Sequence, residues 1–415
     1  MTHDNIALLV SQREALRAEE DAKKRLLAAK KLSLIVDLDQ TVIHTTCEKT
    51  IGEWQADKDN PNYEALKDVK SFQLADDKAS NVVGSWYYIK LRPGLKEFLE
   101  RVSQMYELHI YTMATRAYAQ AVARIIDPDR RYFGDRILSR DENGPDQIKT
   151  LHRLFPTNTD MVVIIDDRGD IWHWSDNLVR VRVYNFFPGA GDINASFLPK
   201  QQELLTSATQ AALPIAPAIK DVSEAETAKS FSVAGKPSDS FPPEATNGVL
   251  TELEQQLLSM GSVDSPEVLE EQVKEQEKLI ISQQTERPLL QKQLLLDQAD
   301  DAADEEAKAK NGGAQDPEHH KQRHSLLHDD DRELENVEAA LRRVHHEFYD
   351  LYLRKSAGPQ VGRIAELRGE KSPKKRLHED SVPDIKVLMP KMKRSVLSGV
   401  HLVFSGIIPL GIDHQ

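Results

Sequence analysis

Two kinds of segment alternate along the chain between residues 32 and 199. Continuous apolar runs, short enough for buried strands, occur at SLIVDLD, SWYYIKLRP, ELHIYT and MVVIIDD. Apolar residues at helical spacing lie between some of these runs, at LKEFLERV, RAYAQAVARII and QIKTLHRLF. Because strands that alternate with helices usually pair in parallel, residues 31–200 are predicted to form an α/β domain with a parallel sheet flanked by helices.

Two further segments belong to the amino-terminal half of this region. Residues 1–30 have the pattern of a charged helix that leads into the first strand. Residues 47–80 contain few apolar residues and several turn formers. They are therefore predicted to be an insertion after the first strand, near the mouth of the site.

The chain beyond the α/β domain changes in composition. Residues 201–250 are rich in Pro, Ser and Ala and poor in aromatic residues, which predicts a disordered linker. Residues 251–330 are rich in Gln, Glu and Leu and are interrupted by Pro266 and Pro288, so we expect short helices or disorder without a packed core. Residues 331–356 are predicted to form an amphipathic helix that docks on the α/β domain or on a partner. Its apolar stripe consists of Leu334, Val337, Leu341, Val344 and Phe348.

The carboxyl-terminal part of the chain carries two weaker signals. Residues 357–394 are predicted to be a basic linker that includes KSPKKR, a cluster that fits either nuclear import or an ordinary solvated stretch. Residues 395–415 begin like a strand, at VHLVFSG, but are too few to enclose a core of their own. We expect them to be the start of an incomplete domain.

Paired carboxylates follow two of the predicted strands. Asp37 and Asp39 come directly after LIV, with Thr41 two positions further on, and Asp166 and Asp167 follow VVII. Because the carboxyl ends of parallel strands open on the ligand crevice of a sheet, these side chains are expected to lie close together. Carboxylates forced together repel each other, and their oxygens suit Mg²⁺ as ligands. For either pair alone, a helix cap or an Asp-rich turn is the ordinary interpretation.

A hydroxyl and an ammonium group could complete such a site. Thr112 follows ELHIY and precedes a helix, where it could hold an anion or simply cap the helix. Lys149 lies on the predicted helix QIKTLHRLF, where a single lysine is normally a solvated charge. Together with the paired aspartates, these residues could hold a phosphate beside Mg²⁺. Asp37 would then take the phosphoryl group, while Asp39 would protonate the departing oxygen and later activate water.

Charge and cysteine content limit the partners that the protein can bind and the cellular compartment that it suits. The formal net charge of -13 repels phosphate backbones, which argues against direct nucleic-acid binding. Cys47 is the only cysteine, so an intrachain disulfide and a cysteine-built zinc site are both excluded, which fits a reducing compartment. No apolar run approaches the length of a membrane span. We expect a soluble intracellular protein without a membrane partner.

The motifs DLDQT, YTMAT and IIDDRGDIW, together with Lys149, resemble the four motifs of the haloacid dehalogenase superfamily, in the version found in RNA polymerase II carboxyl-terminal-domain phosphatases. The longer stretches SLIVDLDQTVIH, LRPGLKEFL and VRVYNFFPGAGDIN and the ending VFSGIIPLG are similar to fungal FCP-type enzymes. This resemblance implies a Rossmann-like parallel sheet of the haloacid dehalogenase type. It also implies a Mg²⁺-dependent nuclear phosphatase that removes phosphate from serine in the YSPTSPS repeats of the polymerase through an aspartyl-phosphate. The phosphorylated repeats and general transcription factors are the implied partners.

The resemblance assigns roles to the four aspartates. Asp37 matches the nucleophile, and Asp39 matches the general acid and base. Asp167 matches the residue that binds Mg²⁺ together with the Asp37 carboxylate and the main-chain carbonyl of Asp39. Asp166 matches the neighbouring essential carboxylate.

Five other residues receive roles from the same resemblance. Thr41 matches the motif threonine that supports the loop, and Thr112 and Lys149 match the pair that holds the phosphate. Arg92, in KLRPG, resembles a substrate-side arginine, and Tyr106 is expected to line the substrate groove.

Two alternatives stay open, because the catalytic motifs do not encode the substrate. The chain could act on another phosphoprotein or a small molecule, or it could be an inactive scaffold of a transcription complex, although its intact motif residues argue against the scaffold. Relatives carry a complete BRCT domain after the helical region, and this chain is expected to end inside the first strand and turn of one, as a fragment or a truncated form.

Overall fold

The computed structural model describes residues 12–74, 84–143, 148–194, 196, 266–310, 323–357 and 382–401. The chain divides into two compact units, Met1–Pro199 with Glu267–Gln415, and Lys200–Pro266, and the fold described below is that of the first. The predicted linker at 201–250, the KSPKKR cluster and most of the predicted strand VHLVFSG lie outside the described residues.

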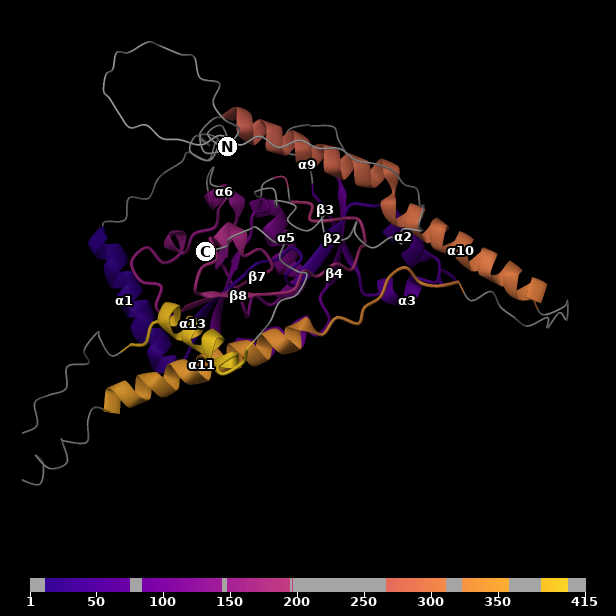
Figure 1. The fold of residues 1–415 in the computed structure, drawn as a ribbon. Coiled ribbons are helices and arrows are strands. Elements are labelled where there is room, and N and C mark those ends of the chain that lie inside the picture. The colour runs from indigo at the N-terminus through magenta and orange to yellow at the C-terminus, as the bar shows by residue number, and fades with distance from the viewer. Residues whose placement is uncertain are drawn as a thin grey trace, which may run out of the picture. The chain divides into compact units, whose positions relative to one another are not determined.

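A five-stranded parallel sheet forms the centre of the unit, in the order β6-β5-β1-β7-β8. Figure 1 labels β7 and β8 of this sheet. The strands span Leu32–Val36 (β1), Tyr106–Tyr111 (β5), Ile137–Leu138 (β6), Val162–Asp166 (β7) and Leu178–Arg180 (β8). Every residue of β1 is buried, as expected of a central strand covered on both faces. This confirms the predicted parallel sheet, whose central strand leads to Asp37.

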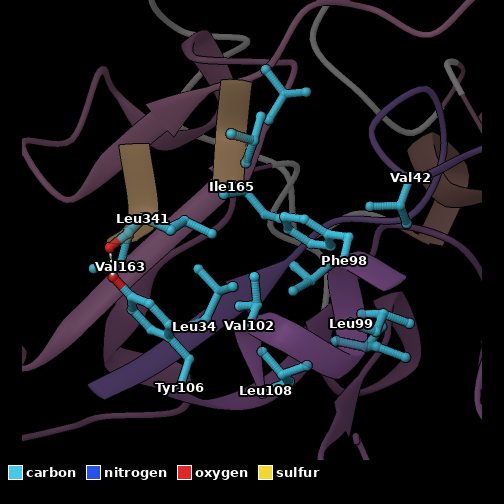
Figure 2. Close-up of a cluster of buried hydrophobic side chains, with 14 of the residues drawn as sticks. Leu34, Val42, Phe98, Leu99, Val102, Tyr106, Leu108, Val163, Ile165 and Leu341 are labelled. Carbon is cyan, nitrogen blue, oxygen red and sulfur yellow. Dashed lines mark hydrogen bonds between the residues drawn. The ribbon is translucent and has the colours of Figure 1, made fainter. Parts of the chain in front are cut away.

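One face of the sheet is covered by helices from distant parts of the sequence. These are α4 (Leu95–Val102), α5 (Arg116–Ile126) and α11 (Glu333–Ala357). Figure 2 shows Leu34 and Val163 of the strands packed with Phe98 and Val102 of α4 and Leu341 of α11. The five stripe residues of α11 are all buried, so the predicted docking of this helix is confirmed, and it docks on the α/β domain.

The other face is covered by two short 3₁₀ helices. These helices, η1 (Leu151–Arg153) and η2 (Asp170–Trp172), pack against Ile35 and Ile164.

The amino-terminal helix α1 (Gln12–Ala29) was predicted from its charged pattern. Its Arg25 donates two hydrogen bonds to the Glu107 carboxylate on β5.

The insertion after β1 forms a second sheet, and its Ile43 and Ile89 belong to the main core. Its antiparallel sheet has the order β2-β4-β3, with β2 at Ile43–Thr46, β3 at Lys70–Gln73 and β4 at Trp86–Leu91. Two short helices, α2 (Thr50–Ala56) and α3 (Tyr63–Leu66), lie between β2 and β3. The run SWYYIKLRP therefore does not join the parallel sheet as its pattern suggested, because an apolar aromatic run fits either kind of sheet.

The Gln-rich region is more ordered than its composition predicted. It forms α9 (Pro266–Glu286) and α10 (Pro288–Lys310), which are 21 and 23 residues long. Leu289, at the start of α10, is fully buried in a cluster with Ile51 and Phe187. The expectation of short helices without a packed core is therefore wrong for these residues. The break between the helices does fall at Pro288, as expected, since Arg287 before it has a positive φ of 50°.

The predicted basic linker contains one more helix, α13 (Ile385–Val396). Its first turns bury Ile385, Leu388 and Met389 in the main core, while Lys386 and Lys391 stay on its outer side. A single apolar face among lysines explains why composition alone indicated a linker. Within the described ranges, no helix is both long and apolar enough to cross a bilayer.

His44, on β2, holds the segment after β8 through hydrogen bonds to Phe187 and Gly191. Its Nδ1 accepts the N–H of Phe187 at 3.0 Å, so the neutral ring carries its proton on Nε2 and donates it to the Gly191 carbonyl at 3.1 Å. Burial lowers the pKa of His44 to about 4. A second ring proton would face the Phe187 N–H, so the folded chain excludes it.

We predict that His44 makes the fold sensitive to acid. Below its ordinary pKa the unfolded chain binds a proton at this residue that the folded chain does not, so stability is lost as the pH falls from about 6.5 to about 4. The loss is about 3 kcal/mol in the free energy of unfolding. Denaturant unfolding of the parent and of His44→Gln at several pH values measures it. Equal pH dependence in the two proteins would show that His44 does not contribute.

Candidate active site

The site lies where β1, β5 and β7 end. Val36 pairs with Ile110 on one side and with Ile165 on the other, so the residues that follow these strands meet at one edge of the sheet. A single pocket there is lined by six of the residues predicted from the sequence. They are Asp37, Asp39, Thr112, Lys149, Asp166 and Asp167.

Lys149 is a buried bridge between two strand ends. Its Nζ lies 2.6 Å from Oδ1 of Asp37 and 2.8 Å from Oδ2 of Asp166, and the residue is 3% exposed. Burial opposes the ammonium charge, but the attraction of Asp166 and Asp37 outweighs it and raises the pKa of Lys149. The lysine is therefore positively charged and belongs to the site, which excludes the solvated charge considered from the sequence.

The backbone around Lys149 differs from the predicted helix. Lys149 lies before the 3₁₀ helix, and its N–H donates to the Ile171 carbonyl at 3.0 Å. Thr150 is extended, at φ -131° and ψ 137°, and its side chain accepts from the His152 N–H. With Thr150 as its cap, the helix begins at Leu151, two residues after the lysine.

Both oxygens of Asp166 are held by donors. Oδ2 accepts from Lys149 and from Nε1 of Trp172 at 2.8 Å, and Oδ1 accepts from the Arg168 N–H at 2.8 Å. Asp166 therefore orients Lys149, and its engaged oxygens make it a poorer metal ligand than its neighbours. Trp172 is a core residue with this polar contact, whereas Trp174 is 64% exposed.

Three carboxylates crowd one point of the site. Oxygens of Asp37, Asp166 and Asp167 all lie within 4.8 Å of one another. Burial, which the attraction of Lys149 only partly offsets, raises the pKa of Asp37 well above its usual range. Burial followed by repulsion from Asp166 raises the pKa of Asp167 to about 7. One lysine does not balance these charges, so the donor set fits a divalent cation with oxygen ligands.

Thr41 holds the Asp167 carboxylate. Its Oγ1 donates to Oδ1 of Asp167 and accepts the Asp167 N–H, both at 3.1 Å. The chain reaches Thr41 through Gln40, which has a positive φ of 58° and bends the loop sharply. Thr41 thus ties the loop after β1 to the loop after β7, in agreement with a supporting role.

Asp39 lines the same pocket but is not one of these three clustered carboxylates. Its Oδ1 lies 2.5 Å from the Tyr118 hydroxyl, and its Oδ2 accepts from Nδ2 of Asn194 at 3.0 Å. Burial, followed by repulsion from Asp192, raises the pKa of Asp39 to about 7. A carboxyl group with such a pKa can give and take a proton near neutral pH.

Thr112 directly follows β5, the strand that pairs with β1. It is 2% exposed and lines the pocket, and its Oγ1 accepts the Ala114 N–H at 3.1 Å. Thr115, not Thr112, caps α5, since its side chain accepts the Tyr118 N–H. The helix-cap interpretation of Thr112 is therefore wrong.

Comparisons with known proteins agree with this geometry. Residues 32–212 match the NLI interacting factor-like phosphatases. The chain is 40% identical over 415 residues to the RNA polymerase II C-terminal domain phosphatase of Schizosaccharomyces pombe, and 37% identical over 432 residues to that of Saccharomyces cerevisiae. These matches cover 100% and 99% of this chain, and 52% and 51% of the relatives.

Two solved structures decide the family. The fission yeast RNA polymerase II CTD phosphatase Fcp1 bound to beryllium fluoride superimposes with a TM-score of 0.62, and a second Fcp1 structure with 0.59. Each is 37% identical and is matched over 80% of its length and 96% of this chain. This chain belongs to the Fcp1-type phosphatase family. It spans about half the length of the curated relatives that it matches.

Two residues do not lie where the predictions for an Fcp1-type protein placed them. Tyr106 begins β5, at the opposite end of the strand from the site, is 1% exposed, and donates its hydroxyl to the Leu341 carbonyl at 2.7 Å (Figure 2). Its prediction as a groove residue is wrong, because α11 covers it. Arg92 is also 1% exposed and is held by protein atoms, so it does not face the substrate as predicted.

Arg92 supports the loop after β1, which contains Thr41, through the main chain of that loop. Its guanidinium donates to the Thr41 carbonyl at 2.8 Å and to the Arg182 carbonyl at 2.9 Å. It also makes a two-point contact with the Asp331 carboxylate, at 2.7 and 2.8 Å. The segment before α11 is thereby connected through Arg92 to Thr41.

Three polar residues near Asp39 were not predicted. Tyr118 and Asn194 bind Asp39, and Asp192 lines the same pocket. The sequence showed Tyr118 only as part of the apolar face of a helix, although a buried tyrosine hydroxyl needs a polar partner. Asp192 and Asn194 followed a glycine-rich turn, and no local pattern connects that turn to β1.

We predict that Asp331→Asn lowers the free energy of unfolding by about 2 kcal/mol, because it leaves the buried Arg92 without a charged partner while keeping the same shape. The matched control is Asp330→Asn, at an exposed neighbouring position, which should change stability by less than about 0.5 kcal/mol. Denaturant unfolding of the three proteins makes the comparison. Equal stability of both variants would contradict the coupling through Arg92.

Proposed function

We propose that this chain is a Mg²⁺-dependent protein-serine phosphatase that acts on the phosphorylated heptad repeats of the RNA polymerase II carboxyl-terminal domain. The observation that carries the proposal is the placement of Asp37 and Asp39 at one strand end, one beside Lys149 and the other with a pKa of about 7. The substrate rests on the similarity to relatives named as RNA polymerase II C-terminal domain phosphatases.

In the first step, the Asp37 carboxylate attacks phosphorus and the bond from phosphorus to the serine oxygen breaks. Asp39 gives its proton to the departing serine oxygen, since an alkoxide is a poor leaving group. Lys149 and Thr112 hold the phosphate oxygens, with the ammonium group already within 2.6 Å of the nucleophile. The product is an aspartyl-phosphate on Asp37.

In the second step, Asp39 takes a proton from water, which attacks the phosphorus of the aspartyl-phosphate. The bond to Asp37 breaks, and inorganic phosphate leaves. The Asp37 and Asp167 carboxylates and the Asp39 carbonyl would hold Mg²⁺, which supplies positive charge for the phosphoryl group. We further propose the nucleus as the location and general transcription factors as additional partners.

The test of this function is phosphate release from phosphoserine heptad peptides, compared with unrelated phosphopeptides and with p-nitrophenyl phosphate. We expect release that requires Mg²⁺, stops in excess EDTA and favours the heptad peptides. Asp37→Asn is the inactive control, because an amide does not attack phosphorus. Equal rates on all phosphopeptides would favour a phosphatase of another substrate. A parent protein without activity on any of them would favour a scaffold.

We predict that Asp39→Asn slows the first step far more for phosphoserine peptides than for p-nitrophenyl phosphate. Nitrophenolate departs with little help, whereas the serine oxygen needs a proton. The variant should load Asp37 quickly from the aryl substrate and hydrolyse the aspartyl-phosphate slowly, which gives a burst of nitrophenol equivalent to the enzyme. Rapid-mixing kinetics of both substrates measures this. Equal losses in the first step and no burst would assign the proton to another group.

A further inference from the structure

Helix α9 reaches the residue that binds Asp39. Gln276, on the inner side of α9, places its Nε2 3.1 Å from Oδ1 of Asn194 and 3.3 Å from the Ile193 carbonyl. Asn194 is 4% exposed, and its Nδ2 donates to Oδ2 of Asp39 at 3.0 Å. A helix from the Gln-rich region is thereby two hydrogen bonds away from the Asp39 carboxylate.

The directions of these hydrogen bonds follow from chemistry alone. A main-chain carbonyl only accepts, so the atom of Gln276 that contacts Ile193 must be the amide nitrogen. That nitrogen also faces Asn194, which must present its oxygen in return. The remaining Asn194 atom is the amide nitrogen, and it therefore faces Asp39 as a donor.

A second glutamine holds the same segment from the same helix. Gln283, two helical turns beyond Gln276 and on the same side of α9, donates to the Ala190 carbonyl at 2.7 Å. Its Oε1 accepts from the Cys47 N–H at 2.9 Å and from the Thr46 hydroxyl at 3.1 Å. The segment from Ala190 to Asn194 is thus fixed at both ends by α9.

We propose that Gln276 is a positioning residue for the proposed phosphatase reaction, acting through the Asn194 amide to hold the Asp39 carboxylate in its productive orientation. A turned amide would place its carbonyl oxygen against Oδ2 of Asp39, and the repulsion would move the carboxylate from its place. The inference rests on the proposed function, because the orientation of Asp39 matters where a proton is transferred. It gives the Gln-rich helix a role in the reaction.

Two substrates with different leaving groups distinguish a positioning role of Gln276 from a merely structural one. Loss of one positioning hydrogen bond should slow the first step by roughly fivefold to tenfold where a proton must reach the serine oxygen. The first step with p-nitrophenyl phosphate needs no such proton and should change by less than about twofold. General damage to the site would slow both substrates equally.

The experiment measures the first step in single turnover, with full-length chains, for a phosphoserine heptad peptide and for p-nitrophenyl phosphate. Gln276→Met removes the donor and leaves Asn194 able to turn. Gln276→Glu offers only acceptors, so it favours the turned amide and should cause the larger selective loss. Gln284→Met is the matched control, since Gln284 lies on the same helix and contacts Ser85.

A double-mutant cycle shows whether the effect passes through the amide. In an Asn194→Ala background, Gln276→Met should cause no further selective loss. Thermal unfolding of each variant shows that it is folded. An active parent with equal losses on both substrates, or with no loss in either Gln276 variant, would overturn the inference alone. A parent inactive on both substrates would overturn the proposed function and this inference with it.

Discussion

The excess of buried negative charge at one edge of the sheet is the constraint on which the rest of the structure depends. Asp37, Asp166 and Asp167 meet within 4.8 Å, and Lys149 is the cation that contacts two of them. Such a cluster persists only if the surrounding structure fixes each carboxylate and limits the freedom of its loop. The hydrogen bonds and ion pairs around the site restrain these carboxylates and their loops.

The restraint comes largely from segments that are distant in the sequence. Arg92 holds the Thr41 carbonyl and is itself held by Asp331, which precedes α11. Gln276 holds Asn194, which in turn binds Asp39. Helix α9 and the segment before α11 thus support the site, and the insertion that carries β2 to β4 provides the surface on which α9 and α10 pack.

The sequence predicted β1, β5 and β7, although not β6 and β8, together with the residues at the ends of these three strands, because buried parallel strands have a simple apolar pattern and their order brings the carboxyl ends together. It did not predict the surroundings of those residues. Lys149 was expected on a helix, but the Thr150 cap delays the helix start. Tyr106 and Arg92 were assigned to the substrate side, but α11 and the segment before it cover them. Contacts between distant segments leave no pattern in the local sequence from which they could be predicted.

The Gln-rich helices show most clearly that such contacts cannot be predicted from a local sequence pattern. A helix that docks through apolar residues has a stripe at helical spacing, which is why α11 was predicted to dock. Helix α9 instead contacts its neighbours through Gln276 and Gln283, whose amides pair with main-chain atoms. Such contacts bury little apolar surface, so composition indicated short helices or disorder without a packed core. They also fix direction as well as distance, because an amide presents a donor on one side and an acceptor on the other. Through Asn194, such directional contacts reach the Asp39 carboxylate and restrict its orientation.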